Sequence, residues 1–265
     1  MIYIILFFIY GLVIGSFCNV VICRLRTGEG LVVQKSHCPQ CKKNIAWKDN
    51  IPVLSYILLR GKCRACQKKI SMQYPLVEFA TGAIFGAVGA FFVHGSIDHL
   101  LVAVLYAFVF AHLVVIFVYD WKYMEIPMNV MWMAIALLIV ANMTRDLHID
   151  AFWTDVWSSV SFTHGMSAVV AFCFFFGLSY ISDETWMGYG DAFIAIAIGL
   201  LLGPIGTFIA LLVAFCVGAI YGIGLMVIKK RSLKTEVPFG PFLIFGLGAA
   251  FVVQNVYPHM ISLFL

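Results

Sequence analysis

Residues 192–228 read AFIAIAIGLLLGPIGTFIALLVAFCVGAIYGIGLMVI, and none of these side chains is charged. A helix that crosses a bilayer needs about 20 apolar residues, so the stretch is too long for one crossing and long enough for two. Gly203-Pro204 is the natural break, because proline cannot continue a helix and glycine permits a turn. We therefore predict two membrane spans here, over 191–202 and 205–228.

Other uncharged windows occur on both sides of this stretch. The chain of 265 residues is 63% hydrophobic and 11% charged, against about 45–50% and about 25% in a soluble domain. This composition excludes a soluble domain and a disordered chain, and the window lengths exclude an outer-membrane barrel, whose strands run over about 10 residues. We predict an all-α polytopic membrane protein of about eight transmembrane helices, near 2–23, 75–94, 99–119, 126–142, 160–181, 191–202, 205–228 and 241–264.

The positions of the basic residues predict the orientation of these spans. Eleven of the 17 Lys and Arg residues lie in 24–74, where the only acidic residues are Glu29 and Asp49. Such an excess marks a cytoplasmic segment, so the N-terminus is predicted to lie outside. With eight spans, Lys122 and the basic residues of 229–234 also fall in the cytoplasm. The charged residues Arg145, Asp146, Asp150 and Asp155 fall in an outer loop. We thus expect a first transmembrane helix (1–23), a cytoplasmic loop (24–74) and a membrane core (75–265).

The loop contains two C-x-x-C pairs, Cys38 with Cys41 and Cys63 with Cys66. Pairs at this spacing are typical of a four-thiolate tetrahedral zinc site. Two disulfides are the alternative, which a reducing cytoplasm disfavours. Four thiolates leave no open coordination position, so the zinc would be structural and would stabilise a loop too short to form its own core. The basic charge follows from topology, with contact to lipid headgroups as an added interpretation, and we expect no nucleic-acid binding.

Asp120 and Asp191 are the ionisable residues that stand out at the predicted membrane edge, where such groups are functional candidates. Asp120 ends the third span, and Asp191 begins the sixth after Gly188-Tyr189-Gly190. Two carboxylates that share a site cannot both ionise easily, and such a pair can activate a water against a peptide carbonyl and protonate the leaving amine. Gly188 and Gly190 would allow close backbone approach and unusual dihedral angles. The alternative is that each Asp only marks a helix boundary.

Six motifs follow one another along the chain: Gly15-Ser16-Phe17-Cys18-Asn19-Val20 with Arg24-Leu25; the paired C-x-x-C loop with Asp49-Asn50-Ile51-Pro52-Val53; Tyr74-Pro75 with Val77-Glu78; Asp120 with Ile126-Pro127; Gly188-Tyr189-Gly190-Asp191; and Val237-Pro238-Phe239-Gly240-Pro241. Together they resemble the type IV prepilin peptidases, membrane aspartyl proteases with a GxGD motif. One departure is Arg26, where the family usually has a proline after Arg-Leu.

The resemblance implies an aspartyl endopeptidase of the bacterial inner membrane. It would cut the basic leader of type IV prepilins or pseudopilins after a glycine, at the cytoplasmic face, for a type IV pilus or type II secretion. Asp120 and Asp191 would be catalytic, and the supporting motif residues would be Gly188, Gly190, Pro238, Gly240 and Pro241. Residues 238–241 are expected to form a re-entrant segment near the pair, or a plain loop into the last span.

Many members also methylate the new N-terminus with S-adenosylmethionine, and their first loop is linked to this activity. That would make 24–74 the methyltransferase region and 75–265 the peptidase core. No G-x-G-x-x-G motif follows a strand, so the methyl donor is implied by resemblance alone. The candidate substrate or methylation residues are Gly15, Ser16, Asn19, Arg24 and Glu78.

Several alternatives stay open at this point. The chain could be a peptidase without methylation, or another GxGD protease, although those carry Pro-Ala-Leu where this chain reads Val-Pro-Phe-Gly-Pro. It could be a proton-coupled carrier that uses Asp120 and Asp191 as relay groups, or a structural assembly factor. For the peptidase, the helix macrodipole predicts that Asp191, at a helix N-terminus, is the ionised base, while Asp120, at a C-terminus, carries the shared proton.

Overall fold

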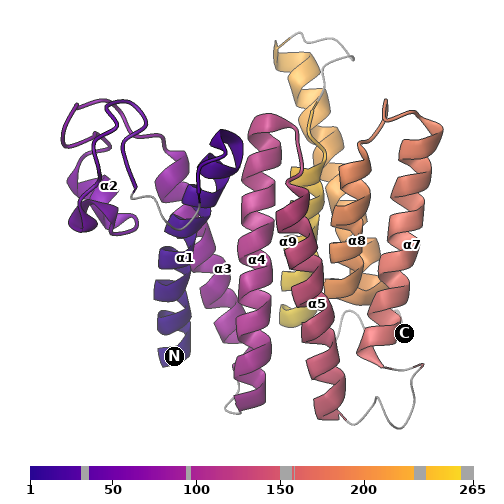
Figure 1. Cartoon of the computed structure of the whole chain (residues 1–265). Helices are drawn as coiled ribbons and strands as arrows, with labels where there is room; N and C mark the ends of the chain where they lie inside the picture. Colours follow the sequence, from indigo (N-terminus) through magenta and orange to yellow (C-terminus); the bar gives the residue numbers. More distant parts are fainter. Residues whose placement is uncertain (31–35, 94–96, 150–156, 158, 230–236, 258–265) are drawn as a thin grey trace. The chain divides into compact units, whose positions relative to one another are not determined.

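The structure is a computed structural model that describes residues 1–30, 36–93, 97–149, 157, 159–229 and 237–257. The chain divides into two compact units, Met1–Val115 and Ile116–Leu265. The α-helices of the described ranges are labelled in Figure 1. These elements are α1 (Ile2–Thr27), the 3-10 helix η1 (Trp47–Asn50), α2 (Leu54–Leu58), α3 (Gln73–Phe92), α4 (Ile97–Tyr123), α5 (Met128–Ile149), α7 (Val160–Ile181), α8 (Tyr189–Lys229) and α9 (Gly240–Val256).

The helices have the length and composition of membrane spans. Six of them, α1, α3, α4, α5, α7 and α8, are long and apolar enough to cross a bilayer. The backbone of α8 is non-helical at Gly203, with φ 67° and ψ −169°, so α8 consists of two helical halves joined at the predicted break. With these halves and the shorter α9, the described part of the chain has eight apolar helical segments. The predicted all-α polytopic membrane fold is confirmed.

Several predicted helix ends differ from the observed ones: α1 continues to Thr27, four residues past its predicted end, and α9 ends at Val256. The helix α4 continues to Tyr123, so Asp120 lies in its last turn and does not end it. The helix α5 continues to Ile149, so Arg145 and Asp146 lie on the helix and not in an outer loop. Asp146 is buried there. Its carboxylate accepts hydrogen bonds from the backbone N–H groups of Val160 (2.7 Å) and Ser161 (2.8 Å). These two groups lie in the first turn of α7, where they have no partner within the helix. The predicted end of the last span, beyond Tyr257, lies outside the described residues.

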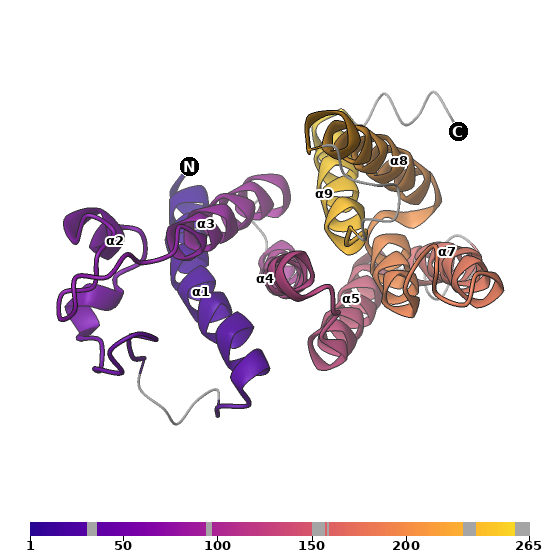
Figure 2. The ribbon, with the colours of Figure 1, turned by 90° about the horizontal axis from the view of Figure 1, so that it is seen from above.

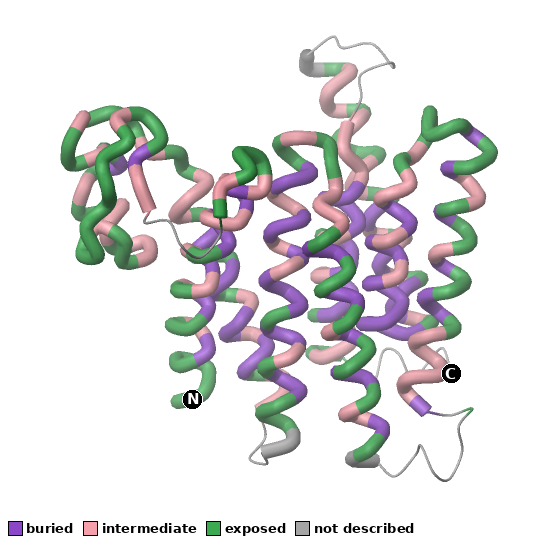
Figure 3. Tube along the Cα trace, viewed as in Figure 1, coloured by how far each residue is buried: buried purple, intermediate pink, exposed green. Residues whose placement is uncertain are grey.

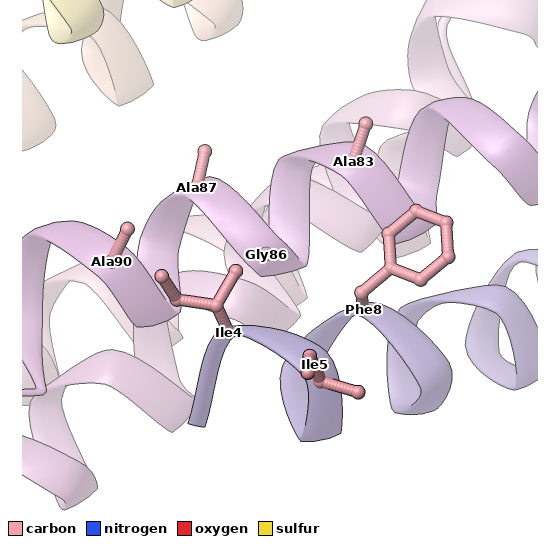
Figure 4. Close-up of a pocket in the computed structure, with 7 residues that line it drawn as sticks. All are labelled: Ile4, Ile5, Phe8, Ala83, Gly86, Ala87 and Ala90. Carbon is pink, nitrogen blue, oxygen red and sulfur yellow. The ribbon is translucent and has the colours of Figure 1, made fainter. Parts of the chain in front are cut away.

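In the first unit, α1 packs along α3, and the loop with η1 and α2 lies at one end of this pair (Figures 1 and 2). The two backbones meet at Gly15, where an added Cβ would come within 2.7 Å of the Cα of Glu78. Small residues allow such close packing in membranes. Further along the pair is an apolar hollow of about 450 Å³ (Figure 4), which suits a surface within lipid. It is lined by Ile4, Ile5, Phe8, Ala83, Gly86, Ala87 and Ala90.

In the second unit, α5, α7 and α9 all pack against α8. Buried positions alternate with exposed ones along these helices (Figure 3), and the exposed positions include large apolar side chains such as Val170 and Phe208. Apolar residues all round a helix are typical of a membrane span. The core of this unit is formed by Met131, Leu138, Phe175, Ile194, Ile198, Leu243 and Leu247, each at most 1% exposed.

Candidate active site and metal centre

The two aspartates lie at helix ends of the second unit. Asp120 is in the last turn of α4 and Asp191 in the first turn of α8, and both side chains are buried, at 5% and 6% exposure. Their charges are close enough to interact directly. The structure therefore brings together the two carboxylates that the sequence paired, although 71 positions separate them along the chain.

The start of α9 supports Asp120. The backbone N–H of Gly240, the first residue of α9, donates a hydrogen bond to the Asp120 carboxylate. A Cβ at position 240 would overlap Oδ2 of Asp120 and would lie 2.9 Å from Ile194 Cδ1. Pro241 follows at the first turn of α9, where its missing N–H costs no helical hydrogen bond. Gly240 of this motif thus lies beside Asp120, and Gly240 and Pro241 form the first turn of α9.

The glycines before Asp191 act by size and not by backbone angle. The backbone N–H of Gly188 donates to the Asp191 carboxylate. A Cβ at Gly190 would come within 2.5 Å of Ile126 Cδ1, whereas one at Gly188 would meet only the nitrogen of Gly190, at 3.9 Å. Neither glycine is among the described residues with positive φ. The expected unusual dihedral angles are therefore absent at Gly188 and Gly190, and close packing explains Gly190 alone.

The four loop cysteines form one cluster. Their Sγ atoms all lie within 4.8 Å of one another, with Cys38 and Cys66 at 4.0 Å, and all four are free thiols. Tetrahedral zinc with bonds of about 2.3 Å would place its sulfur ligands about 3.8 Å apart. Backbone N–H groups of Cys66 and Ala65 lower the pKa of Cys63 to about 7, which favours the thiolate that binds metals. The cluster could therefore hold a metal ion.

Two similar turns build this cluster. In the first turn, Cys38 N–H donates to the Lys43 carbonyl (3.0 Å) and Lys42 N–H to the Cys38 carbonyl (2.8 Å). The second turn repeats the pattern: Cys63 N–H donates to the Lys68 carbonyl and Gln67 N–H to the Cys63 carbonyl, both at 2.9 Å. Each C-x-x-C pair thus presents both thiols from a preformed turn, which the chain spacing alone could only suggest.

The sequence relatives fit this arrangement. Family models match at residues 9–92, for the bacterial peptidase A24 N-terminal domain, and at residues 107–223, for the type IV leader peptidase family. A "Type 4 prepilin-like proteins leader peptide-processing enzyme" from Escherichia coli is 31% identical over 270 residues, which cover 93% of each chain. This chain belongs to the type IV leader peptidase family.

Further members of the family are similar over most of their length. A "Prepilin leader peptidase/N-methyltransferase" from Aeromonas hydrophila is 31% identical over 269 residues, covering 90% of this chain and 86% of the relative. One of the same name from Bacillus subtilis is 27% identical over 239 residues, covering 90% of each. No solved structure matches. The first family model contains the four cysteines and the second contains both aspartates, while Gly240 lies beyond both.

The residues that the resemblance linked to substrate or methylation also lie together, in the first unit. Asn19 donates to the carbonyls of Gly15 (3.3 Å) and Tyr74 (3.1 Å), and Ser16 hydrogen-bonds the Glu78 carboxylate. Arg24 lies more than one turn beyond Asn19 on α1. Its guanidinium donates to the Gly30 carbonyl (2.8 Å) and approaches Glu29 at 4.0 Å. Four of the five candidates therefore form one polar group between α1 and α3, and Arg24 holds the end of α1.

Two features of the structure were missed by the sequence analysis. The segment 49–53 is tied to the second cysteine turn, because Arg64 donates to both oxygens of Asp49, at 2.7 and 2.8 Å, and lowers the pKa of Asp49. Val53, at the end of that segment, has φ 58° and ψ −48°. The proline at position 52 was the available signal for a turn, but nothing in the local sequence predicts that Glu78 accepts a hydrogen bond from Val53.

Proposed function

We propose that this chain is a membrane aspartyl endopeptidase that removes the leader of type IV prepilin-like proteins, with Asp120 and Asp191 as its catalytic pair. The observation that carries the proposal is a pair of buried, interacting carboxylates, each held by a backbone N–H, in a member of the leader peptidase family. The names of the relatives, which speak of leader processing, support the choice of substrate.

The proposed mechanism uses the pair as one unit that holds one proton. The ionised carboxylate takes a proton from a water molecule, whose oxygen attacks the carbonyl carbon of the scissile bond. The protonated carboxylate then gives its proton to the leaving amine. The N–H groups of Gly240 and Gly188 hold the two side chains in place for both steps. Because each carboxylate has such a donor, the helix macrodipole no longer favours Asp191 alone as the base, and the proton belongs to the pair.

We place the reaction at the cytoplasmic face of the bacterial inner membrane. The basic residues of 24–74 and the family support this placement. The substrates would be prepilins or pseudopilins, cut after a glycine just ahead of their apolar helix. That helix can lie in the bilayer beside the enzyme while the basic leader stays in water.

Two cofactors belong to the proposal. Zinc is the metal that best suits four thiolates in tetrahedral reach, and it would stabilise the loop. S-adenosylmethionine would supply the methyl group for the second activity that the relatives' names mention. The amine that would be methylated is complemented, as an ammonium, by a buried carboxylate, and Glu78 provides one beside the loop. We therefore assign methylation to the loop 24–74 with its helix contacts, and cleavage to 75–265.

The test is an assay in lipid with a prepilin-like substrate and S-adenosylmethionine, read by intact product mass. The wild type should release the leader after its glycine, and Asp120→Asn and Asp191→Asn should each lose cleavage by at least about 1,000-fold. Asp183→Asn is the matched control, because Asp183 makes the same change on an exposed turn before α8. Cleavage that survives in both variants would remove the pair from the mechanism. A folded, zinc-loaded wild type that cleaves none of several substrates would favour the carrier or assembly alternative.

A further inference from the structure

Glu78 is a buried carboxylate that the peptidase reaction does not use. It lies in the second turn of α3 and is 8% exposed. Its Oε2 accepts a hydrogen bond from the Val53 backbone N–H at 2.7 Å, and the Ser16 hydroxyl donates to the same carboxylate. Within the described part of the chain, the structure gives Glu78 no cationic partner.

The contacts of Glu78 do not require a charge. A glutamine oxygen could accept both hydrogen bonds, since N–H and O–H groups donate to amide oxygens as well as to carboxylates. A buried charge without a counter-ion destabilises the fold, whereas the neutral amide does not. The packing around position 78 therefore explains a hydrogen-bond acceptor but not why that acceptor is a titratable carboxylate.

The backbone at Val53, whose N–H donates to the Glu78 carboxylate, is strained. Val53 has positive φ, which is rare for a β-branched residue, and Leu54 N–H donates to the Pro52 carbonyl across it. These contacts form a γ-turn of the uncommon type with positive φ. Strained backbone persists only where its surroundings hold it, and it gathers at sites that change on ligand binding. A ligand that took over the carboxylate would let this turn relax.

We propose that Glu78 receives the N-terminal amine of the cleaved substrate and is the base for its methylation. This inference rests on the proposed function. A primary ammonium fits the site because it has three donors for the carboxylate, whereas a sulfonium has none. Depth also fits, since Glu78 lies about 8 Å along α3 from its start, and the new N-terminus of an apolar helix must lie near the bilayer edge.

The reaction step balances as follows. The product ammonium transfers one proton to Glu78 and becomes a neutral amine. The amine nitrogen attacks the methyl carbon of S-adenosylmethionine, the C–S bond breaks, and its electron pair stays on sulfur as a thioether. The product is a methylammonium, so the positive charge passes from sulfur to nitrogen, and Glu78 later returns its proton to water.

Several other charged and titratable groups on the elements around Glu78 have partners of their own. On α1, Arg24 approaches Glu29; in the loop, Asp49 pairs with Arg64; and on α3, the Tyr74 hydroxyl contacts Cys23 Sγ at 3.6 Å. Lys48, beside Asp49, is exposed. Glu78 is thus a carboxylate at this junction whose hydrogen-bond donors, Val53 and Ser16, are both neutral.

The first experiment measures cleavage and methylation together, by intact mass, for Glu78→Gln. We expect cleavage within about twofold of the wild type, and methylation at pH 7 slower by about 100-fold or more, as for loss of a general base. The deficit should shrink as the pH rises past about 8, because the N-terminal amine then loses its proton unaided. Binding of S-adenosylmethionine should be unchanged. Glu184→Gln, on an exposed turn, is the matched control.

A methylation rate in Glu78→Gln equal to that of the wild type would overturn the proposal. So would a deficit that stays constant with pH, because a carboxylate that only clamps the turn would give that result. Failure of the wild type to cleave or to methylate would instead refute the proposed function, and it would appear in the wild-type sample itself.

A second experiment needs no variant. Hydrogen exchange at the Val53 and Leu54 amides of the wild type should become faster when the cleaved product is added, and should stay unchanged with the same product acetylated at its N-terminus. Equal exchange in both cases would refute the binding of the amine by Glu78, whether or not the wild type methylates.

Discussion

At the residue scale, Gly240 shows how one missing side chain completes a candidate active site. Its N–H, at the start of α9, donates to the Asp120 carboxylate. Asp120 lies at the C-terminus of α4, so the contact places the N-terminus of α9 beside it. The macrodipole of α9 therefore offsets that of α4. This contact is the reason why the proton cannot be assigned to Asp120 from helix ends alone.

Gly240→Ala should lower kcat/KM for leader cleavage by about 100-fold, because its Cβ would overlap Asp120 Oδ2 and displace it. Gly248→Ala, in the same helix, is the control, since an added Cβ there meets nothing within 4 Å. Steady-state kinetics on the two purified variants would check this. Equal activity of Gly240→Ala and the wild type would show that Asp120 does not depend on this close approach.

The two glycines of the GxGD motif should differ in the same way. Gly190→Ala should lower the free energy of unfolding by about 1–3 kcal/mol through overpacking against Ile126. The double variant with Ile126→Val, which lacks Cδ1, should recover most of that loss, while Gly188→Ala should be milder than Gly190→Ala. Unfolding in detergent, followed alongside cleavage, would test this; an absence of rescue would place the strain elsewhere.

At the scale of the element, the break in α8 explains a group of buried polar side chains. Pro204 has no N–H, so the Leu200 carbonyl loses its helical partner. Asn142 from α5 (2.8 Å) and His164 from α7 (2.9 Å) both reach this oxygen, and Gln254 from α9 donates to the Leu202 carbonyl at 2.9 Å. Three helices thus satisfy the carbonyls that the break exposes, as the absence of water in a bilayer demands.

Asn142→Leu and His164→Phe should therefore be strongly non-additive. Each single variant leaves one donor on the Leu200 carbonyl and should cost about 1 kcal/mol or less in the free energy of unfolding. The double variant leaves that carbonyl without either donor and should lower the free energy of unfolding by about 1–3 kcal/mol more. A double-mutant cycle in lipid measures this coupling; strict additivity would mean that the two donors do not share the oxygen's stabilisation.

At the scale of the whole molecule, the metal cluster belongs to one compact unit and the aspartate pair to the other. The loop has few buried residues of its own, and Cys38 is the buried member of its cluster. A bound metal would therefore supply much of the order of 36–71, while α7, α8 and α9 are held by their own apolar core.

Chelation should raise hydrogen exchange in 36–71 and leave α7, α8 and α9 unchanged. The wild type should carry about one metal ion per chain, and Cys63→Ser should lose it. Cys173→Ser, which changes an exposed cysteine outside the cluster, should keep it. Metal analysis and exchange mass spectrometry check this together, and retention of the full metal content by Cys63→Ser would contradict a four-cysteine site.

The sequence by itself determined the features that depend on local chemistry. The presence of membrane spans, the break at Gly203-Pro204 and the pairing of C-x-x-C turns all follow from nearby residues, because bilayer thickness, the missing proline N–H and thiol spacing act locally. The roles of Asp120 and Asp191 stay predictions, although their positions at the predicted membrane edge made them candidates. Helix ends were less certain, since capping partners such as Asp146 lie on another helix.

Only the tertiary structure decided which groups meet. Gly240 reaches Asp120, Val53 reaches Glu78, and Asn142 and His164 share the Leu200 carbonyl. Helices that are apolar all round carry no pattern that separates a buried face from a lipid-facing one, so the sequence could not say which faces pack together. The contacts that hold the candidate sites are made across those faces, by backbone groups whose partners are set by packing.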